Sequence, residues 1–361
     1  MKDKKMQGQL SAPTERISLE SSQRAKYRFF AVFLICCGLF LSAFAVSAVY
    51  MRTEHGEKLA DRLEALFGGT GTTPPEQNTD PIDGGNTAPP TDSGEEQPVP
   101  IPEGATPIIT LDLSRPDLGR AYIHNETVYD PDVQTLLSRP IGGTDRTAPP
   151  TVLIIHTHAS EAYLMGGTQY VEGSVGDKTY SQNEAENVLS VGSILCQRLN
   201  EKGITAIHCT VMHDQSGLGG SYERSAETVK RYLALYPDIE YVIDLHRDAV
   251  TTASGELVRA VGKDGEGAIA QILAVIGTDG NGTEHPRWVE NLSLALQLRE
   301  KLNATYPSLC RPVSLRNASF NQELAPYSIL LEIGTCANSP EEAKRAAVLL
   351  ADALAELIYL R

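Results

Sequence analysis

The chain has 361 residues and a formal net charge of −15 at pH 7, and this length allows one or two globular domains with accessory segments. The acidic balance argues against a nucleic-acid-binding surface of clustered Lys and Arg. None of the six cysteines belongs to a Cys-x-x-Cys pair, which argues against a thiolate zinc knuckle and a disulfide-dense scaffold.

Residues 29–50 contain no charged side chain over 22 positions, and a helix of that length spans roughly 30 Å, the thickness of a bilayer core. Arg24, Lys26 and Arg28 stand just before this run, so the positive-inside rule places residues 1–28 in the cytoplasm and everything after the run outside. The alternative is a cleaved signal peptide with small residues near its end, Ala43, Ala45, Ser47 and Ala48. The apolar run is longer than a typical signal-peptide core, which favours a retained single-span anchor.

The sequence between the anchor and the globular part, residues 51–106, is polar. It begins with a charged stretch and continues from residue 68 as a Gly-, Pro- and Thr-rich segment that nearly lacks large apolar side chains. Such a segment cannot bury enough surface to offset its chain entropy, which predicts a disordered linker. As a flexible coil its ends average about 30–40 Å apart, so the following domain is expected well above the membrane surface.

The composition becomes globular near residue 107. Residues 107–146 combine a short strand-like run with a turn-rich stretch, which indicates an N-terminal subdomain or lid. Residues 147–361 contain near-continuous apolar runs, typical of strands covered on both faces. These runs predict strands at 152–156, 204–212, 239–245, 269–277 and 328–333.

Apolar residues at helical spacing predict helices between the strands, at 184–202, 222–236 and 287–304. A last helix is predicted from Ser339 as N-cap, Pro340 at the first helical position and Glu342 completing a capping box. Strands that alternate with helices predict an α/β fold with a mostly parallel sheet flanked by helices.

Polar residues follow or interrupt three of the expected strands. His156, His158 and Glu161 come after the first strand, His246 ends the run "YVIDL", and Glu332 lies within the apolar strand "SILLEIG". Ligands collect at the carboxyl ends of strands in open α/β sheets. Two imidazoles and a carboxylate form a three-ligand set with an open position for water, the pattern of catalytic zinc. A further Glu supplies the base that accepts a proton from the water.

Each of these positions also has a structural interpretation. A histidine at a strand end is most often a hydrogen-bonded surface residue. An ionised Glu332 among aliphatic side chains needs a metal or a partner nearby, and a salt bridge to Arg247 would serve as well.

Several motifs resemble those of the stage II sporulation protein P family. In chain order they are "IIHTHASEAY", "ENVLSVGSIL", "SYERSAETVKRYL", "YVIDLHRDA" and "ILLEIGTCANSPEEA". The resemblance covers most of residues 107–361, and the anchor-plus-linker layout fits it as well. This family is similar to the zinc-dependent N-acetylmuramoyl-L-alanine amidases, so the resemblance implies an amidase-like fold for residues 147–361 and a Zn²⁺ cofactor.

The implied activity is hydrolysis of the amide between the muramyl lactyl group and L-alanine in peptidoglycan, together with an endopeptidase activity on peptide cross-links. The implied setting is endospore engulfment, in which septal wall is thinned at the sporulation septum. The implied partners are stage II sporulation proteins D and M. No nucleic-acid partner is expected, because of the acidic net charge.

The resemblance also implies roles for individual residues. His158 and His246 look like metal ligands, and Glu332 occupies the position of the amidase catalytic glutamate. The carboxylate ligand departs from the broader amidase pattern, because "HTHASEAY" replaces the amidase signature "GHGG". Glu161 is preferred as this ligand because it belongs to the motif, while Glu184 or Glu186 at the start of the next helix remains the alternative.

Two further residues are assigned less directly. His156 is expected to orient a neighbour by a hydrogen bond, with metal ligation as its alternative. Arg247 is expected to stabilise the oxyanion or a stem-peptide carboxylate, with an ion pair to Asp248 or Glu332 as its alternative.

Two other functions remain open from the sequence. One is a degenerate, catalytically inactive wall-binding module, against which the intact candidate ligands argue. The other is a membrane-tethered zinc protease, which the absence of an HExxH motif disfavours.

Overall fold

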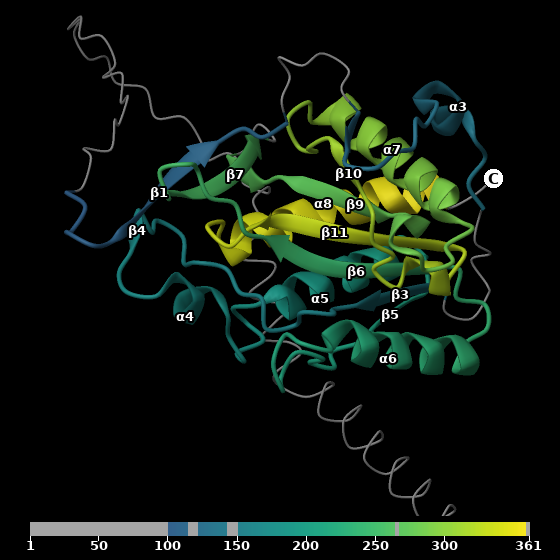
Figure 1. The fold of residues 1–361 in the computed structure, drawn as a ribbon, viewed down its shortest axis with the longest axis horizontal. Coiled ribbons are helices and arrows are strands. Elements are labelled where there is room, and N and C mark those ends of the chain that lie inside the picture. Colours follow the sequence, from purple (N-terminus) through teal and green to yellow (C-terminus); the bar gives the residue numbers. More distant parts are fainter. Residues whose placement is uncertain (1–99, 115–121, 143–150, 264–266, 359–361) are drawn as a thin grey trace, which may run out of the picture. The chain divides into compact units, whose positions relative to one another are not determined.

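The computed structural model describes residues 100–114, 122–142, 151–263 and 267–358 (Figure 1). These residues belong to one compact unit, residues 94–361. The membrane helix expected at 29–50 and nearly all of the expected linker lie outside the described residues. Within the described part, no helix is both long and apolar enough to cross a membrane.

A seven-stranded sheet forms the centre of the fold, in the order β2-β10-β9-β11-β6-β3-β5. In that order the strands are Ile123–Asn125, Val313–Arg316, Ile272–Gly277, Tyr327–Thr335, Tyr241–Asp248, Val152–Ile155 and Ala206–His208. Every neighbouring pair is parallel except β9 and β11, which are antiparallel. The prediction of an α/β fold with a mostly parallel sheet is therefore confirmed.

Helices cover both faces of this sheet (Figure 1). They are α5 (Val188–Glu201), α6 (Ser221–Leu235), α7 (Trp288–Thr305) and α8 (Pro340–Ile358). Successive side chains of a strand point to opposite faces, so Val152 and Ile154 of β3 join the large core with α5, α7 and α8. Leu153 and Ile155 face α6 in a second, smaller core. The fully buried side chains of β3 explain why its sequence is a continuous apolar run.

The two helix starts show how local sequence sets the element boundaries. At α8 the Ser339 hydroxyl accepts from the Glu342 amide at 3.2 Å, and the Glu342 carboxylate accepts from the Ser339 amide at 3.1 Å. The predicted capping box is therefore confirmed. Helix α5 begins at Val188 rather than 184, because the Asn187 side chain accepts from the Leu189 amide at 3.0 Å and caps the helix there.

A second sheet of four strands has the order β4-β1-β7-β8. In that order the strands are Tyr170–Val171, Thr106–Leu111, Leu257–Lys263 and Ala268–Ala270. The short helices are α3 (Val133–Ser138), α4 (Val175–Thr179), η2 (Asp279–Asn281) and η3 (Gln322–Leu324). The described parts of residues 107–146 join three places in the fold: β1 pairs in this second sheet, β2 forms an edge of the main sheet, and α3 packs on α7.

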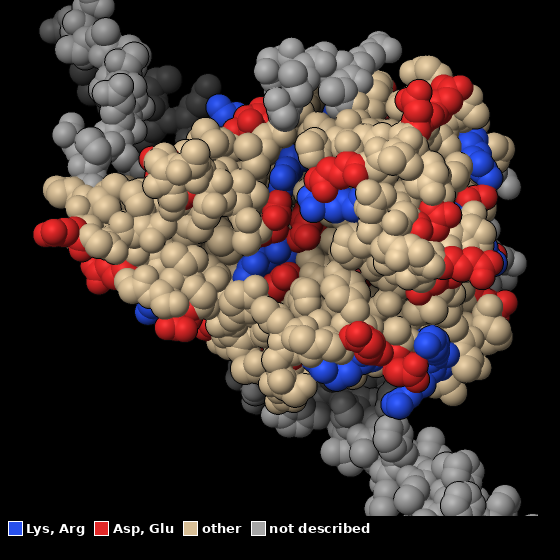
Figure 2. All heavy atoms as spheres, in the orientation of Figure 1, with Lys and Arg blue, Asp and Glu red and all other residues tan. Residues whose placement is uncertain are grey.

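On the face drawn in Figure 2, Lys and Arg side chains are scattered among Asp, Glu and uncharged residues. No continuous basic area covers the described residues on this face.

Gly192 allows α5 to pack closely on the buried His156 and the half-buried His208. A Cβ atom at this position would lie 2.6 Å from His156 Nε2 and 2.7 Å from His208 Nε2. We therefore expect Gly192→Ala to lower the free energy of unfolding by about 1–3 kcal/mol, the usual cost of overpacking a core, despite the higher helix propensity of Ala. Urea denaturation measures this change, and Gly176→Ala, at a glycine with only an ordinary contact to Ser174, is the control. Unchanged stability of Gly192→Ala would contradict the close packing.

Candidate metal centre

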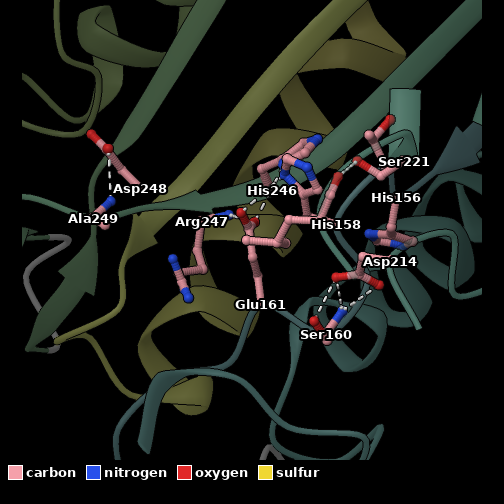
Figure 3. Close-up of polar contacts among 12 residues, drawn as sticks. His156, His158, Ser160, Glu161, Asp214, Ser221, His246, Arg247, Asp248 and Ala249 are labelled. Carbon is pink, nitrogen blue, oxygen red and sulfur yellow. Dashed lines mark hydrogen bonds and ion pairs between the residues drawn. The ribbon is translucent and has the colours of Figure 1, made fainter. Parts of the chain in front are cut away.

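Three side chains converge at the carboxyl ends of β3 and β6 (Figure 3). His158 and Glu161 lie in the turn after β3, and His246 lies within β6. Their candidate ligand atoms all lie within 4.8 Å of one another. Glu161 lies between the two imidazoles: its Oε1 is 3.4 Å from His158 Nδ1, and its Oε2 is 3.2 Å from His246 Nδ1. The structure therefore brings together the three residues expected to bind metal.

The spacing and chemistry of these donors fit zinc. Tetrahedral zinc with bonds of about 2.0–2.1 Å holds its ligand atoms about 3.3 Å apart. Each Glu161 oxygen approaches one imidazole to a similar distance, and the whole donor set lies within 4.8 Å. Two imidazoles and one carboxylate leave a fourth position for water or substrate, as catalytic zinc sites do. The ligand assignment itself remains a prediction.

Burial and charge act in opposite directions on the site. Burial alone would raise the pKa of Glu161, but the charge of His246 and hydrogen bonds from both imidazoles outweigh it and lower that pKa. Burial likewise would lower the pKa of His246, but the carboxylates of Asp244 and Glu161 raise it well above the ordinary value. In the absence of metal these groups therefore form an ion pair. Because a metal ligand must be an unprotonated imidazole, metal affinity is expected to fall as the pH falls.

Asp244 supports His246 from the same strand and was not foreseen from the sequence. Its Oδ1 lies 3.0 Å from His246 Nε2, a charge contact that is not aligned as a hydrogen bond. The Thr157 amide and hydroxyl donate to the two Asp244 oxygens at 2.8 and 2.6 Å, which fixes the carboxylate. The available signal was the spacing: residues i and i+2 of a strand share a face, so the Asp in "IDLH" lies beside the candidate ligand.

We expect Asp244→Asn to weaken zinc binding by about 10–100-fold, the usual effect of losing the partner of a metal-bound histidine. The amide keeps the size of the side chain but removes the charge that faces His246 Nε2. Competition with a chromophoric chelator measures the affinity, and Asp238→Asn on the surface is the control. An unchanged zinc affinity would show that Asp244 does not support the ligand.

Glu332 lies on β11 beside the metal-site strand. It is the register partner of His246 on the parallel strand β6, and its Oε2 is buried without a hydrogen-bond partner. Burial, opposed by the charge of His246, raises the pKa of Glu332 to about 8. No ion pair involves Glu332 among the described residues, so the alternative of a salt bridge to Arg247 is wrong. A buried carboxyl with a raised pKa is a common feature of a catalytic acid or base.

Arg247 is buried, and its guanidinium points away from the two imidazoles (Figure 3). Nε donates to the Ala162 carbonyl at 3.0 Å and Nη2 to the Thr179 carbonyl at 2.5 Å, and the group stacks on the Tyr180 ring at 4.8 Å. The Arg247 amide donates to Glu161 Oε2 at 3.1 Å. These contacts hold the segment that carries Glu161, whereas the expected contact with an oxyanion remains untested.

Asp248 does not pair with Arg247, which was an alternative from the sequence. Its carboxylate instead forms an ion pair with Arg311 at 2.7 Å. The reason is the alternation of β6, which directs neighbouring side chains to opposite faces.

His156 lies apart from the three converging residues (Figure 3). Its Nδ1 is 2.8 Å from the Leu245 carbonyl and its Nε2 is 2.8 Å from His208 Nε2. Burial lowers its pKa to about 3, so the ring is neutral. Among the described residues His156 belongs to no metal-binding group, while its bond to Leu245, next to His246, is compatible with the orienting role that we expected.

Glu184 and Glu186 are exposed and lie in the turn before α5. The Glu186 carboxylate accepts from the Ser181 hydroxyl at 2.8 Å and from the Asn183 amide at 2.7 Å. Neither glutamate joins the His158–Glu161–His246 group. The N-cap at Asn187 explains this position, because it starts the helix after both residues rather than before them.

Asp214 fixes the turn between His158 and Glu161, and this role was not predicted from the sequence. It accepts from the Ser160 amide at 3.1 Å and from the Ser160 hydroxyl at 2.5 Å (Figure 3). The local sequence "MHDQ" does not predict this contact, because the contact depends on where the loop before α6 packs against the turn after β3.

The fold and the site define an α/β protein with a two-histidine, one-glutamate group at the carboxyl edge of its sheet. The family model of stage II sporulation protein P matches residues 112–355. The chain belongs to this family. A relative named stage II sporulation protein P, from Bacillus subtilis (strain 168), is 30% identical over 223 residues, which cover 58% of this chain and 51% of that protein. The chain thus spans about half the length of this curated relative.

Several solved structures are similar at low scores. The amidase Ami1 of Mycobacterium abscessus, in its apo form, has 16% identity and a TM-score of 0.36 over 59% of this chain and 100% of that one. The catalytic domain of CwlV, an N-acetylmuramoyl-L-alanine amidase from Bacillus (Paenibacillus) polymyxa var. colistinus, has 11% identity and a TM-score of 0.35 over 57% and 97%. At these scores the similarity carries no functional inference.

Proposed function

We propose that the protein is a zinc-dependent peptidoglycan hydrolase that cleaves the amide between muramic acid and L-alanine. The observation that carries this proposal is the convergence of His158, Glu161 and His246 within 4.8 Å. Glu332, whose buried oxygen has no hydrogen-bond partner, lies on the neighbouring strand. Membership of the stage II sporulation protein P family supports the choice of peptidoglycan as substrate.

Each residue has one role in the proposed mechanism. His158, Glu161 and His246 would hold Zn²⁺, which supplies a Lewis acid that polarises a carbonyl and lowers the pKa of water. Glu332 accepts a proton from the attacking water and delivers it to the amide nitrogen as the C–N bond breaks. Asp244 keeps His246 oriented through its contact with Nε2.

A groove beside the loop that carries Glu161 is large enough for part of a glycopeptide. Its volume is about 780 Å³, and its walls include Tyr163, Leu164, Lys178 and Glu186. Ligand sites of this size commonly combine apolar walls with a few polar groups. Lys178 would attract a carboxylate of a stem peptide, and Glu186 would attract its amine.

The proposal extends to the location and the partners of the protein. Residues 29–50 would anchor it in the cell membrane, with residues 1–28 cytoplasmic and the hydrolase domain outside, at the sporulation septum. It would thin septal wall during engulfment together with stage II sporulation proteins D and M. A side activity on peptide cross-links belongs to the same proposal.

Product analysis of digested sacculi tests the bond specificity. Mass spectrometry should detect free stem peptides and glycan strands whose muramic acid has lost its peptide. Cleaved cross-links with the stem peptides still attached would instead indicate an endopeptidase. Bound sacculi without any released product would indicate an inactive wall-binding module, and hydrolysis of protein alone would indicate a protease.

A further inference from the structure

The motif "SYERSAETVKRYL", residues 221–233, forms α6, and its role is not explained by the three metal-binding candidates. The start of this helix is fixed against the metal site. The Thr157 hydroxyl contacts the Ser225 hydroxyl at 2.8 Å, and the Asn321 side chain donates to the Tyr222 carbonyl at 2.8 Å. The second residue of the helix is therefore held in a defined position beside the turn after β3.

Tyr222 contacts a candidate metal ligand directly. Its ring meets the His158 ring edge to face, with centroids 5.6 Å apart and planes at 84°. The ring also lies near Phe320, with centroids 6.0 Å apart.

The Tyr222 hydroxyl is available to an outside acceptor. It makes no hydrogen bond with any described residue. The hydroxyls of two buried tyrosines are already used: Tyr163 donates to the Ile333 carbonyl at 2.9 Å and Tyr241 donates to the Gly142 carbonyl. Unlike these two hydroxyls, the Tyr222 hydroxyl is left to donate to a substrate, and its ring lies against the candidate metal ligand His158.

The reaction needs a donor of this kind. Water adds to the scissile carbonyl carbon, its proton passes to Glu332, and the carbonyl π electrons move to the oxygen, which becomes negatively charged. A positioned hydrogen-bond donor stabilises that oxygen more in the transition state than in the ground state. The Arg247 guanidinium already donates through Nε and Nη2 to the carbonyls of Ala162 and Thr179, whereas the Tyr222 hydroxyl has no such partner among the described residues.

From this arrangement we propose that Tyr222 is a catalytic residue whose hydroxyl donates a hydrogen bond to the oxyanion during amide hydrolysis. The hydroxyl keeps its proton throughout. When the oxyanion re-forms the carbonyl, the C–N bond breaks and Glu332 returns its proton to the leaving nitrogen, so that water and amide yield acid and amine. This inference rests on the proposed hydrolase function.

Tyr222→Phe in the full-length protein separates the hydroxyl from the ring. Loss of one oxyanion donor typically lowers kcat by about 100-fold or more, and we expect this with KM and zinc content unchanged, because the ring still packs on His158. Binding of a phosphinate analogue of the scissile amide should weaken at least about 10-fold, whereas binding of the intact muramyl peptide, measured in the Glu332→Gln background, should not change. Tyr236→Phe, at the other end of the same helix, is the matched control.

Wild-type kcat in Tyr222→Phe would overturn the proposal, as would a loss of kcat that follows a loss of zinc, because the hydroxyl would then act on the metal site rather than on the substrate. Tyr222→Leu removes the ring as well and should lower zinc affinity, which reports the packing role separately. If the wild-type protein releases no product, the proposed function fails; if wild type is active and Tyr222→Phe equals it, only the role of Tyr222 fails.

Discussion

Replacing Glu332 with Gln is expected to lower kcat by about 10²–10⁴-fold, the range that a general acid–base group contributes, while zinc content stays at the wild-type level. The amide keeps the shape of the side chain but cannot accept a proton from water. Zinc binding should persist because Glu332 is not among the three converging ligand candidates. Product release from sacculi and the zinc content of the purified protein are the two measurements.

The substitution should not unfold the protein. The Glu332 Oε2 atom is buried without a partner, and burial raises the pKa of this carboxyl to about 8, so near neutral pH the substitution replaces a mostly neutral acid with a neutral amide and breaks no stabilising contact. We therefore expect an equal or higher melting temperature near neutral pH. Glu341→Gln, an exposed residue in the first turn of α8, is the control for the chemical change. Full activity of Glu332→Gln, or inactivity that follows zinc loss, would contradict the assigned role.

The elements that position the site could be predicted from sequence because each has a strong local signal. The apolar run of β3 is buried on both faces, and the capping box of α8 is made by its own residues, Ser339 and Glu342. The candidate ligands stand directly beyond or within such strands. Carboxyl ends of adjacent parallel strands meet at one edge, so His158 and His246 are expected to lie close together if their strands are neighbours, as β3 and β6 are.

The rest depends on contacts between residues far apart in the chain. The order of strands in a sheet has no local signature, so the antiparallel pair β9 and β11 and the second sheet were not foreseen. The direction of the Arg247 side chain depends on carbonyls at 162 and 179, which the loop after Glu161 brings to it. The place of Tyr222 depends in the same way on how α6 docks against β3.

Glu161 is the metal-site residue for which the sequence left a direct alternative. We expect Glu161→Gln to weaken zinc binding by more than the roughly 10–100-fold that loss of a ligand's partner costs, because one of three donors loses its charge. Glu186→Gln should leave zinc affinity unchanged, because that carboxylate is exposed and bonded to Ser181 and Asn183. Chelator competition compares the two variants, which carry the same chemical change.

A second measurement shows whether Glu161→Gln acts at the site or by unfolding. In the metal-free protein the Glu161 carboxylate is one of the two charges that raise the pKa of His246. Removing that charge should lower the His246 pKa, while Asp244 still holds it above the value that burial alone would give. An NMR titration of the imidazole follows this shift in the folded variant. Retained zinc affinity in Glu161→Gln, together with loss of zinc in Glu186→Gln, would move the carboxylate ligand to the turn before α5 and require that turn to fold toward His158 when metal binds.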